Sequence, residues 1–335
     1  MKIFIDYNCN ILYASLYIEH LRNNFEISFE KAPFDLLPQK ENLLLFSVVG
    51  SNKLFNFVID FADSSAINEL AYEWCDAYGK VNYNLISGNY FDIIKIVKIS
   101  PSFGVKIWGK YTAIFYTILH YLKFYPASDF RRLLSNYISQ KNRLMISEYR
   151  NHTSDSKYIF FASTLWNKQN HNSEEVETNN YRGNFIRACR KNANIKFEGG
   201  FAPNSEMGIY EGLFMRNRVS IKEYVEKISR SACAFNTPAV FSCHGWKLGE
   251  YLALGKAIIS TPIKNELPTP LEHGVNIHIV TGDETEINEA IKKICSEDNY
   301  RKKLESGAYQ YWLDYGLPKN AINDLFKKVN LNMLK

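Results

Sequence analysis

The sequence lacks the short motifs that identify several large enzyme classes. Neither Gly-x-Gly-x-x-Gly nor Gly-x4-Gly-Lys-Ser/Thr occurs, which disfavours an ordinary dehydrogenase and a P-loop NTPase. Its six cysteines are scattered and form no Cys-x-x-Cys pair. In a chain of 335 residues they indicate buried apolar residues of a reducing compartment rather than a disulfide framework. No Asp-x-Asp is present, and no cluster of His, Cys and carboxylates has zinc spacing.

Long apolar segments are also missing. The longest apolar run, 43–49, is far shorter than the roughly 20 residues that a membrane span requires. The first residues, 1–6, read directly as a strand, so we expect no secretory signal and a soluble, cytoplasmic protein. A net charge of +5 is mild and does not by itself indicate a nucleic-acid partner.

The composition is that of a globular protein. Hydrophobic residues make up 46% of the chain and charged residues 22%, which excludes collagenous and wholly disordered classes. A length of 335 residues suggests about two domains. Aromatic residues, at 15%, are abundant and suit either a core or a surface that contacts carbohydrate or lipid.

Two alternating series of strands and helices follow one another along the chain. The alternation predicts an α/β protein of two Rossmann-like domains, with parallel sheets facing across a cleft and ligands at the carboxyl ends of the strands. The polar cluster 151–156 reads as a linker. We therefore expect an acceptor-binding domain over 1–150, a second domain over 151–318, and a C-terminal segment, 319–335, whose helix crosses back to the first domain.

The most informative stretch is 235–261. A strand ends near Asn236, a loop of mostly small residues runs to Gly245, and a helix then begins. A helix start presents free backbone N–H groups and the positive end of its dipole, which suits a pyrophosphate. Lys247 adds a cation there, and Glu250 could accept hydrogen bonds from both hydroxyls of a ribose. Taken alone, however, Glu250 could equally be a solvated helix residue.

In residues 250–261, Gly255 stands five residues after Glu250, and a short apolar strand follows directly. This pattern resembles the nucleotide-sugar half of GT-B fold glycosyltransferases. The resemblance covers about 157–330. It implies that Glu250 binds the donor ribose and that Gly245, Trp246 and Lys247 neighbour the diphosphate. Many retaining members have another Glu eight residues earlier, where this chain has Ser242, so the stereochemical outcome stays open.

Further donor-site candidates are weaker. Ser163 and Thr164 follow the first strand of the second domain and could contact the donor. An ordinary turn at the end of a strand would have the same residue types. Arg182 and Arg187 lie on the next helix, and Arg187 could simply face solvent. His244 lies at the end of the loop that leads to Gly245, where it could contact the sugar. The alternative is a loop histidine whose hydrogen bonds are satisfied within the protein. The remaining candidates are Arg216 and Arg218, because an arginine there could neutralise the leaving diphosphate through bidentate hydrogen bonds.

The first domain offers a basic, aromatic stretch and two acids. Between 93 and 147 there are nine Lys and Arg against one acid, Asp129, together with many Phe, Tyr and Trp. This suits an acceptor that carries a phosphate on a lipid at an anionic membrane face; the alternative is a core with a solvated basic face. Asp60 and Asp63, at the end of a predicted strand, are the candidate catalytic bases, although a helix-capping role suits them as well.

These features predict a glycosyltransferase that moves a sugar from a nucleotide-diphosphate donor to a saccharide or lipid-linked saccharide acceptor. The missing Asp-x-Asp argues against the metal-dependent GT-A architecture, so we expect no metal and no cofactor besides the donor. The expected location is the cytoplasm, with contact at the inner face of an anionic membrane. Two alternatives remain: a nucleotide-sugar epimerase or hydrolase of the same fold, and a non-catalytic sugar-nucleotide-binding module.

Overall fold

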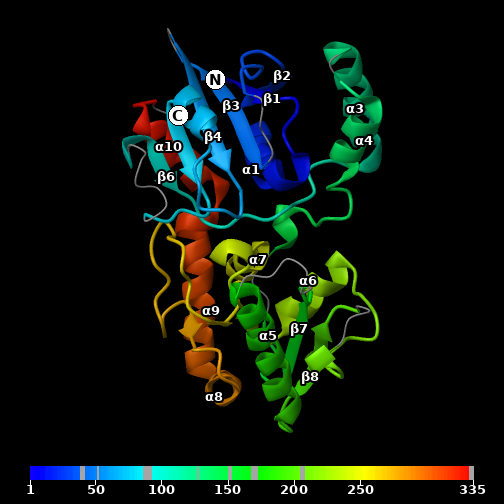
Figure 1. Cartoon of the computed structure of the whole chain (residues 1–335), viewed down its shortest axis with the longest axis vertical. Coiled ribbons are helices and arrows are strands. Elements are labelled where there is room, and N and C mark those ends of the chain that lie inside the picture. The colour runs from blue at the N-terminus through cyan, green and yellow to red at the C-terminus, as the bar shows by residue number, and fades with distance from the viewer. Residues whose placement is uncertain are drawn as a thin grey trace. The chain divides into compact units, whose positions relative to one another are not determined.

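The computed structural model divides into two compact units (Figure 1). Unit 1 comprises Met1–Glu148, Glu266–Pro268 and Tyr315–Lys335, and unit 2 comprises Tyr149–Asn265 and Thr269–Asp314. The structure describes residues 1–37, 42–50, 53–85, 93–126, 128–149, 153–166, 173–203 and 208–331. Part of the predicted linker, 151–152, lies outside these residues.

Unit 1 is built on a six-stranded sheet of order β2-β1-β3-β4-β5-β6. Its strands are β1 (Lys2–Asp6), β2 (Glu26–Glu30), β3 (Leu43–Val49), β4 (Leu54–Asp60), β5 (Ala77–Lys80) and β6 (Ile96–Lys98). Its helices are α1 (Ile11–Asn24), α2 (Glu69–Trp74), α3 (Lys110–Phe124), α4 (Phe130–Ile138) and α10 (Pro318–Lys328).

The first sheet is not parallel throughout, which corrects the prediction for this unit. β1 pairs in parallel with β2, and β4, β5 and β6 are parallel neighbours, but β3 is antiparallel to both β1 and β4. Only residues 50–53 connect β3 to β4. A parallel pair needs a crossover of about a dozen residues or more, so a connection this short joins antiparallel strands.

Helix α10 belongs to the core of unit 1. It packs against α1, β5 and β6. Its apolar side chains Ala321, Ile322, Leu325 and Phe326 are buried in the same cluster as residues of β1, β3 and β4. The last helix of the chain thus completes the hydrophobic core that the first strand begins.

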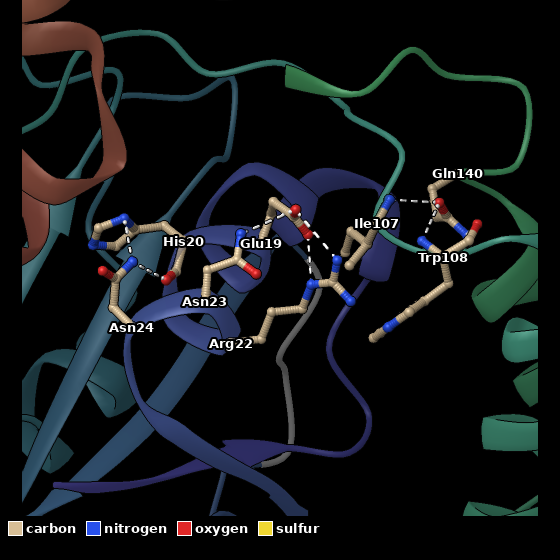
Figure 2. Close-up of polar contacts among 8 residues, drawn as sticks. All are labelled: Glu19, His20, Arg22, Asn23, Asn24, Ile107, Trp108 and Gln140. Carbon is tan, nitrogen blue, oxygen red and sulfur yellow. Dashed lines mark hydrogen bonds and ion pairs between the residues drawn. The ribbon is translucent and has the colours of Figure 1, made fainter. Parts of the chain in front are cut away.

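Polar side chains fasten the α3–α4 pair to unit 1. The Gln140 side-chain oxygen accepts hydrogen bonds from the backbone N–H groups of Ile107 (2.8 Å) and Trp108 (3.2 Å), just before α3 begins (Figure 2). The Trp108 ring stacks on Tyr137 of α4, with centroids 5.5 Å apart. At the other end of α3, Lys123 donates to the carbonyl of Phe29 on β2.

Unit 2 contains only parallel pairings among its described strands. Its strands are β7 (Tyr158–Ser163), β8 (Lys196–Phe201), β9 (Ala234–Asn236), β10 (Ile258–Ser260) and β11 (His278–Ile279). Its helices are α5 (Ser173–Lys191), α6 (Ile221–Arg230), α7 (Trp246–Ala253), α8 (Glu284–Ser296) and α9 (Asp298–Tyr311). β7 pairs with β8, and β10 pairs with both β9 and β11, all in parallel.

The two sets of strands join beside β7. The backbone N–H of Ala232 donates to the carbonyl of Tyr158 (2.7 Å), and the N–H of Phe160 donates to Ser231 Oγ (3.1 Å). The resulting strand order is β8-β7-β9-β10-β11. The chain leaves β7 toward β8 on one side and then returns to β9 on the other, so the order reverses between β7 and β9. In open α/β sheets, ligands bind at the carboxyl ends of the strands at such a reversal.

Candidate anion-binding site

A cavity of about 220 Å³ lies where the strand order of unit 2 reverses. Residues after β7, after β9, at the start of α7 and on α5 surround it. Its lining consists of Phe161, Ser163, Thr164, Trp166, Arg182, Phe235, Asn236, Thr237, Ala239, Gly245, Trp246 and Lys247. These lining residues include two cations and no carboxylate, so the cavity favours an anion.

Arg182 connects the loops that follow the two central strands. Its Nε donates to Thr237 Oγ1 (3.1 Å), after β9, and one terminal nitrogen donates to the carbonyl of Thr164 (3.1 Å), after β7. The guanidinium lies 4.3 Å from the centroid of the Trp166 ring. Arg182 is buried, and this burial lowers its pKa to about 10, so the side chain stays charged at neutral pH.

Packing of α5 on the sheet explains how Arg182 reaches this position. Phe185, one helical turn further along α5, stacks on Phe235 of β9 with ring centroids 4.4 Å apart. The same ring meets Phe161 of β7 edge-on. Because Phe185 and Arg182 are three residues apart, they share one face of the helix. The apolar contact therefore fixes the arginine over the carboxyl ends of both strands.

Lys247 is the second cation of the cavity, and its side chain is half-buried. Its Nζ donates to the carbonyl of Ala162 on β7. Burial is the main cause that lowers the pKa of Lys247 to about 7; the charge of Arg182 lowers it further, and that of Glu250 raises it. An anion in the cavity would favour the protonated lysine, because an opposite charge nearby stabilises the charged form.

The start of α7 forms one side of the cavity. Gly245 is its N-cap, and no side chain caps the helix there. The first backbone N–H groups of a helix have no intrahelical partner, and the dipole favours negative charge at this end. Gly245, Trp246 and Lys247 all line the cavity, so the helix start and both cations converge on one space.

The cavity brings together six of the candidate donor-site residues: Ser163, Thr164, Arg182, Gly245, Trp246 and Lys247. The other five, Arg187, Arg216, Arg218, His244 and Glu250, are not among its lining residues. His244 and Glu250 are buried next to it in the chain, at 6% and 5% exposure, and both have partners. Arg216 and Arg218 are exposed.

The other six lining residues were not named as candidates from the sequence: Phe161, Trp166, Phe235, Asn236, Thr237 and Ala239. The signal for Asn236 and Thr237 was their position directly after the apolar strand Ala-Phe, at the carboxyl end of β9. Asn236 Nδ2 donates to Ser260 Oγ on the neighbouring strand β10 (2.9 Å), which fixes the end of β9. The order of strands, not the local sequence, decides that this end borders the cavity.

The two candidate bases of unit 1 lie in different surroundings. Asp60 is 1% exposed, and its Oδ2 accepts from Lys80 Nζ (2.9 Å) and from the Tyr78 hydroxyl (2.5 Å). Its Oδ1 accepts from the backbone N–H of Ala62 (2.8 Å). Asp63 is exposed. Asp60 therefore holds buried groups together, whereas Asp63 can meet a ligand from solvent.

The described part of the chain has neither a metal-binding cluster nor a membrane-spanning helix. No group of three or more His, Cys, Asp or Glu side chains there could hold a metal ion. No helix within the same residues is long and apolar enough to cross a bilayer.

Comparison with known proteins gives only a distant likeness. No family model matches the chain, and no curated protein matches it. Among solved structures, it is similar to TarM, with 13% identity, a TM-score of 0.43 and coverage of 81% of this chain and 48% of that one. For MnaA of S. aureus with UDP, the identity is 12%, the TM-score 0.40 and the coverages 80% and 63%.

A third structure is HepE of Anabaena in complex with UDP and glucose, with 14% identity, a TM-score of 0.43 and coverage of 78% of this chain and 65% of that one. The chain thus spans less than two thirds of the length of each of these three proteins.

Proposed function

We propose that the chain is a GT-B type glycosyltransferase whose unit 2 binds a nucleotide-diphosphate sugar. The observation that carries the proposal is the cavity at the strand-order reversal, where Arg182, Lys247 and the start of α7 meet without a lining carboxylate. The diphosphate would lie in this cavity. The sequence resemblance, which runs through α7 and β10, supports the same placement.

The chemistry of sugar transfer explains why such a cavity is useful. When the bond between the sugar and the diphosphate breaks, negative charge develops on the leaving phosphate. Preorganised cations and backbone N–H groups in a water-poor site stabilise that charge. Arg182 and Lys247 would supply this stabilisation without a metal ion. Glu250, one turn along α7 from Trp246, would bind the ribose. Ser163 and Thr164 would contact the donor from the end of β7.

Unit 1 would bind the acceptor, a saccharide or a lipid-linked saccharide. An inverting reaction needs a base that accepts the proton of the attacking hydroxyl. Asp63 suits this role better than Asp60, because Asp63 is exposed whereas Asp60 is buried and its carboxylate accepts from Lys80 and Tyr78.

Calorimetric titration with UDP, GDP and ADP tests the donor site. We expect one of these nucleotides to bind the wild type, and Arg182→Gln to weaken it by about tenfold or more, because a hydrogen bond to a charged group is worth about 1.5–3 kcal/mol. Arg187→Gln is the matched control: it lies on the same helix, donates to Asn184 (3.0 Å) and does not line the cavity. The donor site is wrong if no nucleotide diphosphate binds, or if both variants bind equally well.

The reaction is tested separately with the sugar form of the nucleotide that binds. A transferase releases the nucleotide diphosphate much faster when a saccharide acceptor is present. Release at the same rate without acceptor indicates a hydrolase. Consumption of the sugar nucleotide without acceptor, with conversion to an isomeric sugar nucleotide, indicates an epimerase, and binding without turnover indicates a binding module.

A further inference from the structure

Helix α3 exposes an apolar stripe. The stripe consists of Tyr111, Phe115, Ile118, Leu119, Leu122 and Tyr125, which are 85%, 61%, 47%, 45%, 69% and 68% exposed. Helical spacing places the first five on one side of the helix, and Tyr125 is the residue that follows its last turn. The opposite side, with Ala113, Thr117, His120 and Phe124, is buried. A surface helix normally carries polar residues on its outer side, so this stripe requires an explanation.

The surroundings of the stripe are basic. No Asp or Glu occurs from 99 to 128, which includes the whole of α3. Lys110 stands at the start of the stripe, and Arg131 and Arg132 begin the neighbouring helix α4; all three are exposed. Figure 1 shows α3 and α4 lying alongside one another at the edge of unit 1. Exposed apolar side chains and exposed cations therefore lie on the same helix pair.

From this combination we propose that the α3 stripe docks unit 1 onto the surface of an anionic lipid bilayer. At 1.5 Å per residue the stripe is about 21 Å long, so the helix would lie along the interface. Its aliphatic and phenyl side chains would enter the acyl region. Tyr111 and Tyr125, at its two ends, have the amphipathic rings that are enriched at membrane interfaces.

The charge around the α3 stripe favours a bilayer over a second copy of the chain as the partner that covers it. In a symmetric dimer the same patch meets itself, which would bring Lys110 and Arg131 close to cations of the partner. Like charges that meet across an interface disfavour association. An anionic bilayer instead attracts every one of these side chains. The docking surface does not depend on the donor site of unit 2.

Anchoring of α3 means that the stripe can be changed without unfolding the unit. Gln140 and Lys123 hold the helix from its buried side and its ends, and neither belongs to the stripe. Phe115 and Leu122 are mostly exposed, so serine at both positions leaves the core intact. Leu36 in unit 1 and Ile209 in unit 2, at 81% and 75% exposure, are the matched control positions.

The test is cosedimentation of the full chain with vesicles. We expect binding to phosphatidylcholine vesicles that contain half phosphatidylglycerol, weaker binding in high salt, and little binding to phosphatidylcholine alone. Phe115→Ser with Leu122→Ser should weaken binding at least tenfold, while Leu36→Ser with Ile209→Ser should not. Lys110→Gln with Arg131→Gln should weaken it about 25-fold, since each basic residue contributes about fivefold. Far-UV circular dichroism checks that each variant is folded.

Three outcomes would overturn the proposal. One is binding to anionic vesicles that the stripe variant leaves unchanged. Another is equal binding to neutral and anionic vesicles. The third is a wild-type dimer in light scattering that becomes a monomer in the stripe variant, without vesicle binding by either protein, because a second copy would then cover the stripe.

Discussion

The pair Asp60 and Lys80 illustrates how a site residue predicted from sequence can be structural instead. Both side chains are almost fully buried, and each neutralises the other at 2.9 Å. From the sequence, Asp60 ends an apolar strand, which is where catalytic carboxylates gather. Lys80 gives no local signal that it is buried, because Ala-Tyr-Gly-Lys resembles a turn as much as a strand. Only the pairing of β4 with β5 brings the two charges together.

We predict that Asp60→Asn lowers the free energy of unfolding of unit 1 by about 3–5 kcal/mol, because it leaves the buried ammonium of Lys80 without its counter-ion. Asp60→Asn combined with Lys80→Met should recover much of that loss. Urea unfolding measures both variants. Asp63→Asn, at an exposed position, is the control and should change stability by less than about 0.5 kcal/mol. Wild-type stability in Asp60→Asn would show that the buried pair is not the stabilising interaction.

Lys247 gives a prediction about pH. Burial lowers its pKa to about 7 in the folded chain, against an ordinary value of 10.5. Between these values the unfolded chain binds a proton that the folded chain does not, so the contribution of Lys247 to stability rises with pH. At about 1.4 kcal/mol per pH unit, the rise from pH 7 to pH 8.5 is about 2 kcal/mol.

Lys247→Met removes this contribution. We therefore expect the variant to be more stable than wild type at pH 7 and its advantage to shrink by about 2 kcal/mol at pH 8.5, measured by urea unfolding of the ligand-free protein. Comparing wild type with variant at each pH cancels the other titrating groups. Binding of a nucleotide diphosphate should be weaker in the variant. A stability difference that does not change with pH would mean that Lys247 remains fully charged in its cavity.

At the scale of elements, the sequence predicts what local pattern determines. The apolar run that becomes β7, the helix that starts after Gly245 and the return to strand at β10 all follow from spacing and from a glycine. The antiparallel course of β3 was missed, because a buried strand has the same apolar pattern in either direction. It is decided by the short connection to β4 and by the pairing with β1.

The cavity and the α3 stripe mark the limit of prediction from pattern. Lys247 and Gly245 could be placed in the site because a helix start is visible in the sequence. Arg182 could be noticed but not placed, since the stacking of Phe185 on Phe235 positions it. Similarly, α3 is apolar on both sides, and no periodicity tells which side is core. The exposure of Phe115 and Leu122 distinguishes them from Phe124.

At the scale of the whole molecule, the described residues of each unit form their own hydrophobic clusters. In unit 1, one cluster includes residues of β1, β3, β4 and α10, and another includes residues of β3, β4, β5 and α2. In unit 2, a cluster includes residues of β7, β9, β10 and α8. The route of the chain does not follow this division, since Tyr315–Lys335 returns to unit 1 after the last strand of unit 2. Sequence neighbours near the C-terminus therefore contribute to the stability of different units.

This division predicts two unfolding transitions that respond to different changes. Phe326 is 1% exposed in the first of the unit 1 clusters, so Phe326→Ala should destabilise unit 1 by about 3–5 kcal/mol. The nucleotide diphosphate that binds unit 2, at about 100 times its Kd, should stabilise that unit by about 2.7 kcal/mol. In scanning calorimetry, the substitution should lower one transition and the ligand should raise the other. Lys327→Ala, an exposed neighbour on α10, should shift neither transition appreciably.

Each change should leave the other transition in place, because the residues that it affects lie in one unit only. Phe326→Ala can be titrated with the nucleotide at a temperature where unit 1 has begun to unfold. If its affinity is then still that of the wild type, unit 2 holds the donor site by itself. A single transition that both the substitution and the ligand move would show instead that the two units unfold as one cooperative body. The helix at the end of the chain would then stabilise the donor site as well as the sheet against which it packs.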